Sequence, residues 1–128
     1  MNVLTALPPL ILVMSGGAVG AGLRYLVGLW AFDNLGPGLP FGTWTVNILG
    51  GLAMGLLAGT LSKINGGEPL RLLIGVGVLG GFTTFSAFSL ELFNMVIRGD
   101  AVLAGAYAVS SVAGSVVALY AGVALARA

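Results

Sequence analysis

Residues 80–89 read Gly-Gly-Phe-Thr-Thr-Phe-Ser-Ala-Phe-Ser and lie inside the third of four long apolar segments. Glycine is a poor helix former, and the two adjacent threonines are β-branched, so we expect the helix to be interrupted between Gly80 and Thr84. Carbonyls that such an interruption frees at membrane depth must face protein, water or an ion. Phe85 and Phe88 then share one face of the resumed helix, which indicates part of an ion pathway.

The composition is that of a membrane protein. The chain has 128 residues, of which 58% are hydrophobic and 7% are charged, and its mean hydropathy is +1.08. Soluble domains carry about 25% charged residues, so an ordinary water-soluble fold is excluded. Each uncharged run is near or above the roughly 20 residues that span a bilayer as a helix; the runs cover residues 1–23, 34–62, 72–90 and 101–126.

We therefore expect an all-α membrane protein with residues 1–128 in one integral membrane domain. Loops rich in glycine and proline separate four transmembrane helices, which we place at about residues 4–30, 41–62, 68–97 and 101–126. The first run lacks the basic segment of a secretory signal peptide. The chain contains no cysteine and no histidine, so the usual metal clusters and thiol chemistry are missing, and we do not expect an enzyme.

Basic residues are distributed almost evenly between the two sides of the membrane. Four spans put Lys63, Arg71 and Arg127 on one side and Arg24 and Arg98 on the other. Because an excess of basic residues sets the orientation, three against two gives almost no bias. Either the chain inserts by weak cues or the first helix is assigned wrongly, or the chain inserts both ways, which allows an antiparallel homodimer. We favour the second interpretation.

Glycines repeat every four residues on two of the expected helices, a spacing that lets membrane helices approach closely. The positions are Gly16 and Gly20 on the first helix, and Gly51, Gly55 and Gly59 on the second. We interpret them as packing positions only. Four thin helices cannot enclose a pore, so a pathway would require association.

Uncharged polar residues within the spans carry the functional signal. Asn47 follows Thr43 by one turn, and an amide in hydrocarbon needs a partner, which is either a neighbouring helix or a passing ion. Tyr107 and Ser111 form a similar pair on the last helix. Amide and hydroxyl donors, with the positive edges of aromatic rings, can solvate a small anion without trapping it. The ionisable residues Arg24 and Glu91 lie nearer the helix ends.

The chain resembles the Fluc or CrcB family of small bacterial fluoride channels along essentially its whole length. The most specific match is the run at 80–89, and the others are residues 16–25, residues 42–47 with Gly50, and the pair of Tyr107 and Ser111. The resemblance implies an antiparallel homodimer with two fluoride pathways. By this resemblance, Phe85 and Phe88 are the pore phenylalanines and Asn47 is the pore amide.

The resemblance also assigns the remaining site residues. Ser86, Tyr107 and Ser111 would form a polar track, with Thr43 and Arg24 toward a vestibule and Glu91 near an exit. A structural sodium ion would be held at the centre of the dimer by backbone carbonyls, for which Gly80 and Thr83 are the matching positions. Ala87 departs from the pattern, because relatives often have a hydroxyl there.

The function implied is passive fluoride export across a bacterial inner membrane. One charge crossing 100 mV corresponds to about 2.3 kcal/mol, so no pump is needed. A small multidrug-type antiporter is an alternative, but it would need a membrane carboxylate, and Glu91 lies close to a helix end. A structural or accessory membrane subunit is a second alternative, although it does not explain the aromatic pair beside the helix interruption.

Overall fold

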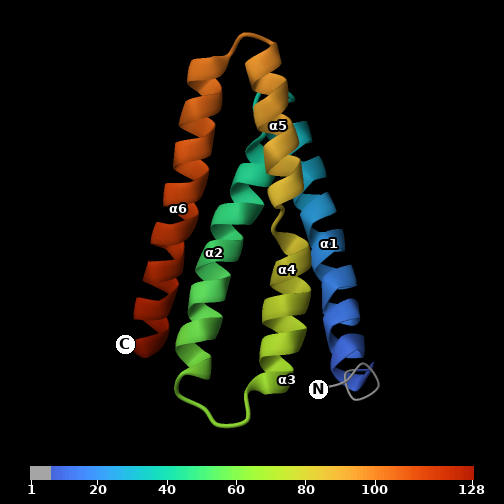
Figure 1. The fold of residues 1–128 in the computed structure, drawn as a ribbon, viewed down its shortest axis with the longest axis vertical. Helices are drawn as coiled ribbons and strands as arrows, with labels where there is room; N and C mark the ends of the chain where they lie inside the picture. The colour runs from blue at the N-terminus through green and yellow to red at the C-terminus, as the bar shows by residue number, and fades with distance from the viewer. Residues whose placement is uncertain (1–6) are drawn as a thin grey trace.

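The computed structural model describes residues 7–128, and all of its regular secondary structure is helical (Figure 1). The first, second and last spans are single helices: α1 (Leu7–Leu35), α2 (Phe41–Leu61) and α6 (Ala101–Arg127). The third span is made of four consecutive segments, which are α3 (Glu68–Leu70), η1 (Arg71–Leu79), α4 (Gly80–Phe82) and α5 (Phe85–Ile97).

Four helical stretches are long and apolar enough to cross a membrane: Pro8–Leu35, Phe41–Leu61, Glu68–Ile97 and Ala101–Arg127. The all-helical fold class with four membrane-spanning helices is therefore confirmed. The start of α1, the turn between α2 and α3, and the C-terminus lie at one end of the molecule (Figure 1). The turns between α1 and α2 and between α5 and α6 lie at the opposite end.

The first helix extends five residues beyond the expected end at Trp30 and stops at Leu35. Nothing between Trp30 and Leu35 breaks a helix, because neither glycine nor proline occurs there. Gly36 ends it: this residue has φ +80°, and its N–H donates to the Phe32 carbonyl at 3.1 Å. The expected start at Leu4 lies outside the described residues.

The third span departs from regular α-helix in two places. From Arg71 to Leu79 it is a π-helix, and its pattern continues in the bond from the Gly80 N–H to the carbonyl of Gly75, five residues earlier. Gly80 and Gly81 stay helical, contrary to expectation. Only the residues between α4 and α5 are extended, with φ/ψ of −83°/157° at Thr83 and −149°/122° at Thr84.

Close packing of backbones explains why so many glycines lie in the helices. A Cβ on Gly20 would collide with the backbone of Val78 in η1, and one on Gly55 would collide with the Leu119 carbonyl in α6. Every glycine assigned to packing from its spacing has such a neighbour: Gly16, Gly20, Gly51, Gly55 and Gly59. The packing interpretation is confirmed, and α1 lies against η1 while α2 lies against α6.

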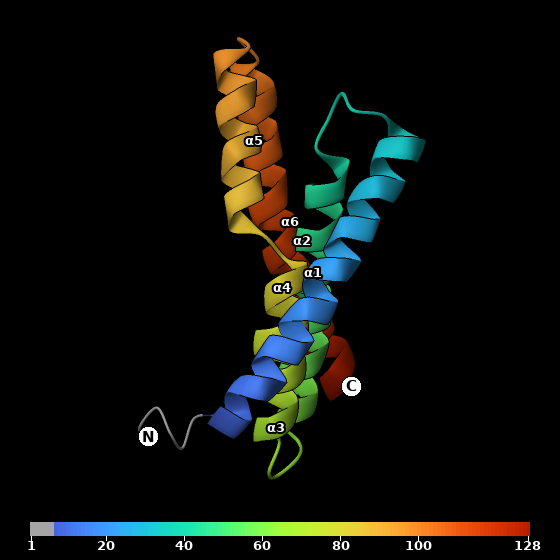
Figure 2. The same ribbon diagram turned by 90° about the vertical axis from the view of Figure 1, so that its right-hand side faces the viewer.

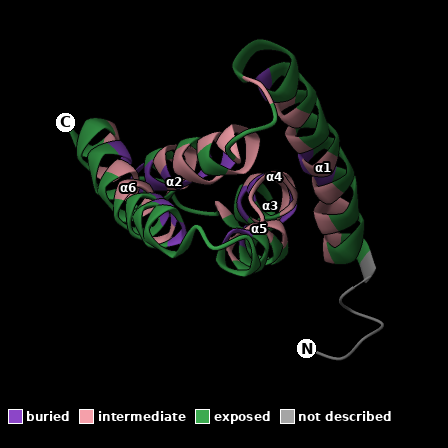
Figure 3. Cartoon of the chain, turned by 90° about the horizontal axis from the view of Figure 1, so that it is seen from above, coloured by how far each residue is buried: buried purple, intermediate pink, exposed green. Residues whose placement is uncertain are grey.

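Toward the end that carries the α5–α6 turn, the molecule divides into two arms (Figure 2). One arm contains α5 and α6, and the other contains α1 and the beginning of α2. Viewed along the long axis, the outward faces of the helices are largely exposed, as expected for surfaces that contact lipid (Figure 3). The extended residues between α4 and α5 lie where the arms meet.

Candidate functional site

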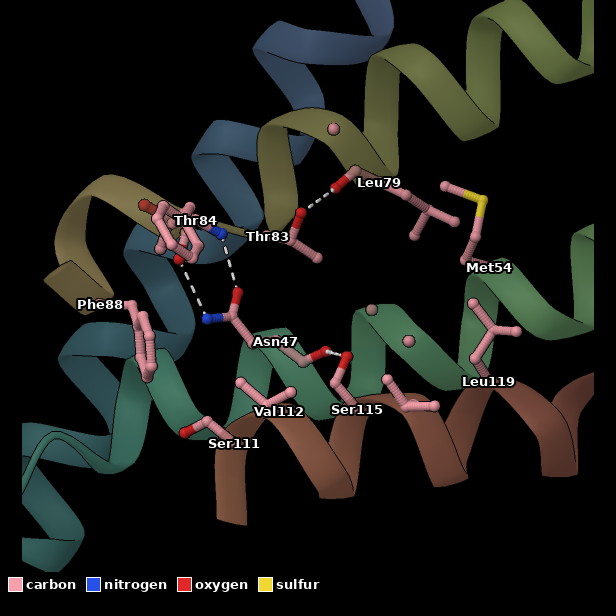
Figure 4. Close-up of a pocket in the computed structure, with 15 residues that line it drawn as sticks. Asn47, Met54, Leu79, Thr83, Thr84, Phe88, Ser111, Val112, Ser115 and Leu119 are labelled. Carbon is pink, nitrogen blue, oxygen red and sulfur yellow. Dashed lines mark hydrogen bonds between the residues drawn. The ribbon is translucent and has the colours of Figure 1, made fainter. Parts of the chain in front are cut away.

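A groove of about 430 Å³ runs beside the extended residues, between α2, the third span and α6 (Figure 4). None of its fifteen lining residues carries a charge. Its polar side chains come from asparagine, threonine and serine, and the rest of the lining is glycine, methionine, aliphatic side chains and phenylalanine. The lining includes Asn47, Gly80, Thr83, Phe85, Phe88 and Ser111, all predicted site residues.

Asn47 satisfies both backbone polar groups of Thr84. Its Nδ2 donates to the Thr84 carbonyl at 3.0 Å, and its Oδ1 accepts from the Thr84 N–H at 2.8 Å (Figure 4). A buried backbone group without a partner costs roughly 1–3 kcal/mol. The Oδ1 of Asn47 therefore replaces, from another helix, the acceptor that a continuous helix would give the Thr84 N–H, and its Nδ2 adds a donor to the carbonyl with which α5 begins.

Side-chain hydroxyls complete the hydrogen bonding on either side of this pair. The hydroxyl of Thr83 donates back to the Leu79 carbonyl at 2.9 Å, and the hydroxyl of Thr84 accepts from the Ala87 N–H at 3.2 Å. Thr84 is thus the N-cap of α5. Ser115 of α6 donates to the Asn47 carbonyl at 3.1 Å, which ties α6 to the same point of α2.

The carbonyls of Gly80 and Thr83 lose the donors that a continuous helix would give them. Helix geometry pairs the Gly80 carbonyl with the Thr84 N–H and the Thr83 carbonyl with the Ala87 N–H. Those N–H groups bond instead to the side chains of Asn47 and Thr84. Neutral carbonyl oxygens of this kind suit a hard cation, so the donor chemistry fits the sodium site that the family resemblance implies.

Aromatic rings line the side of the groove formed by α5. The Phe85 and Phe88 rings have centroids 5.7 Å apart, and the Phe88 and Tyr107 rings 5.2 Å apart, both pairs tilted by 46°. Phe88 is 6% exposed, whereas Phe85 is 78% exposed. Phe88 therefore belongs to the core of the single chain, and Phe85 stands on its surface.

Ser111 is the buried polar residue that needs explanation. It is 4% exposed, and its Oγ has no hydrogen-bond partner among residues 7–128. It lies one helical turn beyond Tyr107 and lines the same end of the groove as Phe88 (Figure 4). A buried hydroxyl without a partner is costly, so Ser111 is suited to a polar occupant of the groove.

Glu91 lies outside the groove and is held by two hydroxyl groups. Thr43 of α2 donates to its Oε1 and Tyr107 of α6 donates to its Oε2, each at 2.7 Å. The structure thus brings together three predicted site residues from α2, α5 and α6. Because Glu91 is bonded to Thr43 and Tyr107 outside the groove, its carboxyl group is not part of the groove lining.

Two further predicted residues lie outside the groove lining. Arg24 donates from Nε to the Gly81 carbonyl at 3.0 Å. Ser86 is exposed on the first turn of α5, where its hydroxyl lies 3.4 Å from that of Thr84. Sequence reasoning missed Thr84 both as the partner of Asn47 and as the N-cap of α5, although threonine is a preferred N-cap residue.

These features define a multi-pass helical membrane protein with an uncharged groove that is mostly apolar and carries a few amide and hydroxyl groups. Residues 11–123 match the family model described as CrcB-like protein, Camphor Resistance (CrcB). The chain belongs to this family, as its resemblance indicated.

Curated relatives extend over nearly the same length. The fluoride-specific ion channel FluC of Sphingopyxis alaskensis is 55% identical over 116 residues, which cover 90% of this chain and 92% of the relative. The protein of the same name from Phenylobacterium zucineum is 57% identical over 120 residues, covering 92% and 94%. The relative in Mesorhizobium japonicum, named likewise, is 45% identical over 118 residues. The family is one of ion channels and not of enzymes.

Proposed function

We propose that this chain is a fluoride-selective channel that lets fluoride leave the cytoplasm passively. The observation that carries the proposal is the uncharged groove with the unpartnered hydroxyl of Ser111 beside Phe88. Relatives that match most of the chain bear the name of a fluoride-specific ion channel. The antiporter alternative is not favoured, because Glu91 is bonded to Thr43 and Tyr107 outside the groove.

Neutral groups suit a small anion that must enter and leave quickly. The ring edge of Phe88 and the hydroxyl of Ser111 offer partial positive charge without a full cation, which would hold the ion tightly. Asn47 contributes its amide to the same groove, although both of its polar atoms bond Thr84. In this proposal Asn47 shapes the pathway while Phe88 and Ser111 face the ion, and Tyr107 supports the Phe88 ring from α6.

A second copy in antiparallel orientation would complete the pathway. Phe85 lines the groove and is 78% exposed, so an apolar ring stands where a neighbouring chain would cover it. The nearly even distribution of basic residues allows both orientations in the membrane. We infer an antiparallel homodimer in a bacterial inner membrane, with lipid around its outer faces.

We also propose that a structural sodium ion lies where the two copies meet. The carbonyls of Gly80 and Thr83 are the groups that would hold it, since both residues line the groove and their helical donors are used elsewhere. A bound cation would neutralise the partial negative charge of these carbonyls. Its role is structural, so it takes no part in moving fluoride.

Fluoride release from liposomes tests the proposed function. We expect vesicles that contain the purified chain to release fluoride far faster than chloride, because ring edges and neutral donors match the smaller anion. A fluoride-selective electrode and a chloride electrode measure both ions in one vesicle preparation. Equal release of the two ions, release of neither, or a fluoride rate that scales with the sodium gradient would contradict the proposal.

Replacing Phe88 by isoleucine removes the ring edge and keeps an apolar side chain. We expect Phe88→Ile to lower the fluoride rate by about ten-fold or more, since each 1.4 kcal/mol of lost ion stabilisation slows passage ten-fold. Phe93→Ile is the matched control: Phe93 is on the same helix, 59% exposed and outside the groove. If both variants conduct like the parent chain, the ring-edge account is wrong.

Accessible tags test the antiparallel arrangement. We expect a C-terminal tag to be labelled from both sides of the membrane, because each dimer would contain one chain in each orientation. Two lysines added to the turn at residues 64–67 should drive all chains into one orientation and abolish conduction. Labelling of the parent chain from one side only would exclude the antiparallel dimer.

A further inference from the structure

Arg24 bonds the end of a helical segment rather than an acidic side chain. The bond from its Nε to the Gly81 carbonyl joins α1 to the last turn before the extended residues Thr83 and Thr84. The two ion pairs among residues 7–128 are Arg71 with Glu68 and Arg98 with Asp100, so neither involves Arg24. A basic side chain half-buried in a membrane span therefore has a backbone carbonyl as its partner.

The Gly81 carbonyl requires this partner. In a continuous helix it would accept from the N–H of Phe85, but Phe85 starts α5 after two extended residues. No backbone group takes the place of that donor among the described residues. The carbonyl also lies in the last turn of the η1–α4 segment (residues 71–82), where the final carbonyls have no helical donor.

The face of α1 that carries Arg24 packs against the same segment along its length. A Cβ on Gly20 would meet the backbone of Val78 and Phe82, and a Cβ on Gly81 would lie 2.5 Å from the Gly17 carbonyl. Gly17, Gly20 and Arg24 follow one another at helical spacing on one face of α1. The backbones can therefore touch, and the arginine fixes the segment at its end.

We propose that Arg24 is a positioning residue that fixes the η1–α4 segment through the bond from Nε to the Gly81 carbonyl. Asn47 holds Thr84 from the α2 side, so the extended residues are held between two helices. The rotation of the segment determines where the neighbouring Gly80 carbonyl points. This role goes beyond the vestibule position that the family resemblance implied for Arg24.

Three substitutions separate the hydrogen bond from the charge. Glutamine places its Nε2 at the same distance along the side chain as the Nε of arginine, so Arg24→Gln keeps a donor and removes the charge. Lysine has a carbon at that position and its ammonium one bond further, so Arg24→Lys keeps the charge and displaces the donor. Arg24→Met removes both. Arg98→Gln is a control for the loss of one positive charge from a loop.

The local readout is hydrogen–deuterium exchange over residues 80–88 in lipid nanodiscs without fluoride. We expect the exchange rate in Arg24→Gln and in Arg98→Gln to stay within about two-fold of that of the parent chain. Arg24→Lys and Arg24→Met should exchange about ten-fold faster or more, because neither side chain places a donor where Nε lies and the Gly81 carbonyl loses its partner. Residues 101–110 of α6 should exchange alike in all variants.

Fluoride release from liposomes is the second readout, and it alone rests on the proposed function. We expect Arg24→Gln to release fluoride within about two-fold of the parent rate. Arg24→Lys should release it at least about ten-fold more slowly, because it loses the hydrogen bond to the Gly81 carbonyl. The opposite order, with lysine retained and glutamine lost, would assign Arg24 to anion attraction and overturn the proposal. Parent-like exchange in both Arg24→Lys and Arg24→Met would overturn it too, even in a chain that conducts no fluoride.

Discussion

The amide of Asn47 is the interaction on which the rest of the structure depends. Hydrocarbon offers no hydrogen bonds, so a backbone can leave the helical path at membrane depth only if its polar groups find other partners. Asn47 supplies one donor and one acceptor to the same residue, Thr84. Without Asn47, the Thr84 N–H would lose the bond that takes the place of its helical bond to the Gly80 carbonyl. Thr84 is also the residue that caps α5, the helix that carries Phe88.

Pairing among the ionisable residues leaves the groove uncharged. Glu91 is bonded to two hydroxyls and Arg24 to a carbonyl, so each contributes to the packing of helices around the groove. In the proposed pathway an ion would meet only weak dipoles: the ring edge of Phe88 and the hydroxyl of Ser111, which both line the groove. An anion bound by such groups is stabilised enough to enter and weakly enough to leave. This balance is the physical basis of the proposed conduction.

Composition and spacing were sufficient to predict the four spans, because apolar length and close glycine packing are properties of local sequence. The end of the first helix required knowledge of Gly36 at φ +80°, since the preceding residues tolerate a helix or a loop. The π-helix of η1 has no sequence signal that we recognise. Gly80 and Gly81 remain helical because α1 packs against their segment, a tertiary effect.

In the candidate site, too, some features could be predicted from the sequence and others depend on tertiary packing. Residue type indicated Asn47 as unusual within a span, and the family resemblance added Phe88 and Ser111. The partner of Asn47, however, lies 37 residues away and depends on how α2 meets the third span. Arg24 was expected near a vestibule from the family resemblance. Its bond to a carbonyl 57 residues away became visible only with the packing of α1.

The most direct test of the central claim is a solid-state NMR distance measurement in lipid bilayers between the Asn47 side-chain nitrogen and the Thr84 carbonyl carbon. A hydrogen bond through the carbonyl oxygen places these nuclei about 4 Å apart. Dipolar dephasing should therefore be strong in the parent chain and absent in Asn47→Asp, which lacks the nitrogen. A separation beyond about 6 Å would mean that no such bond exists, and the account of the interrupted span would be wrong.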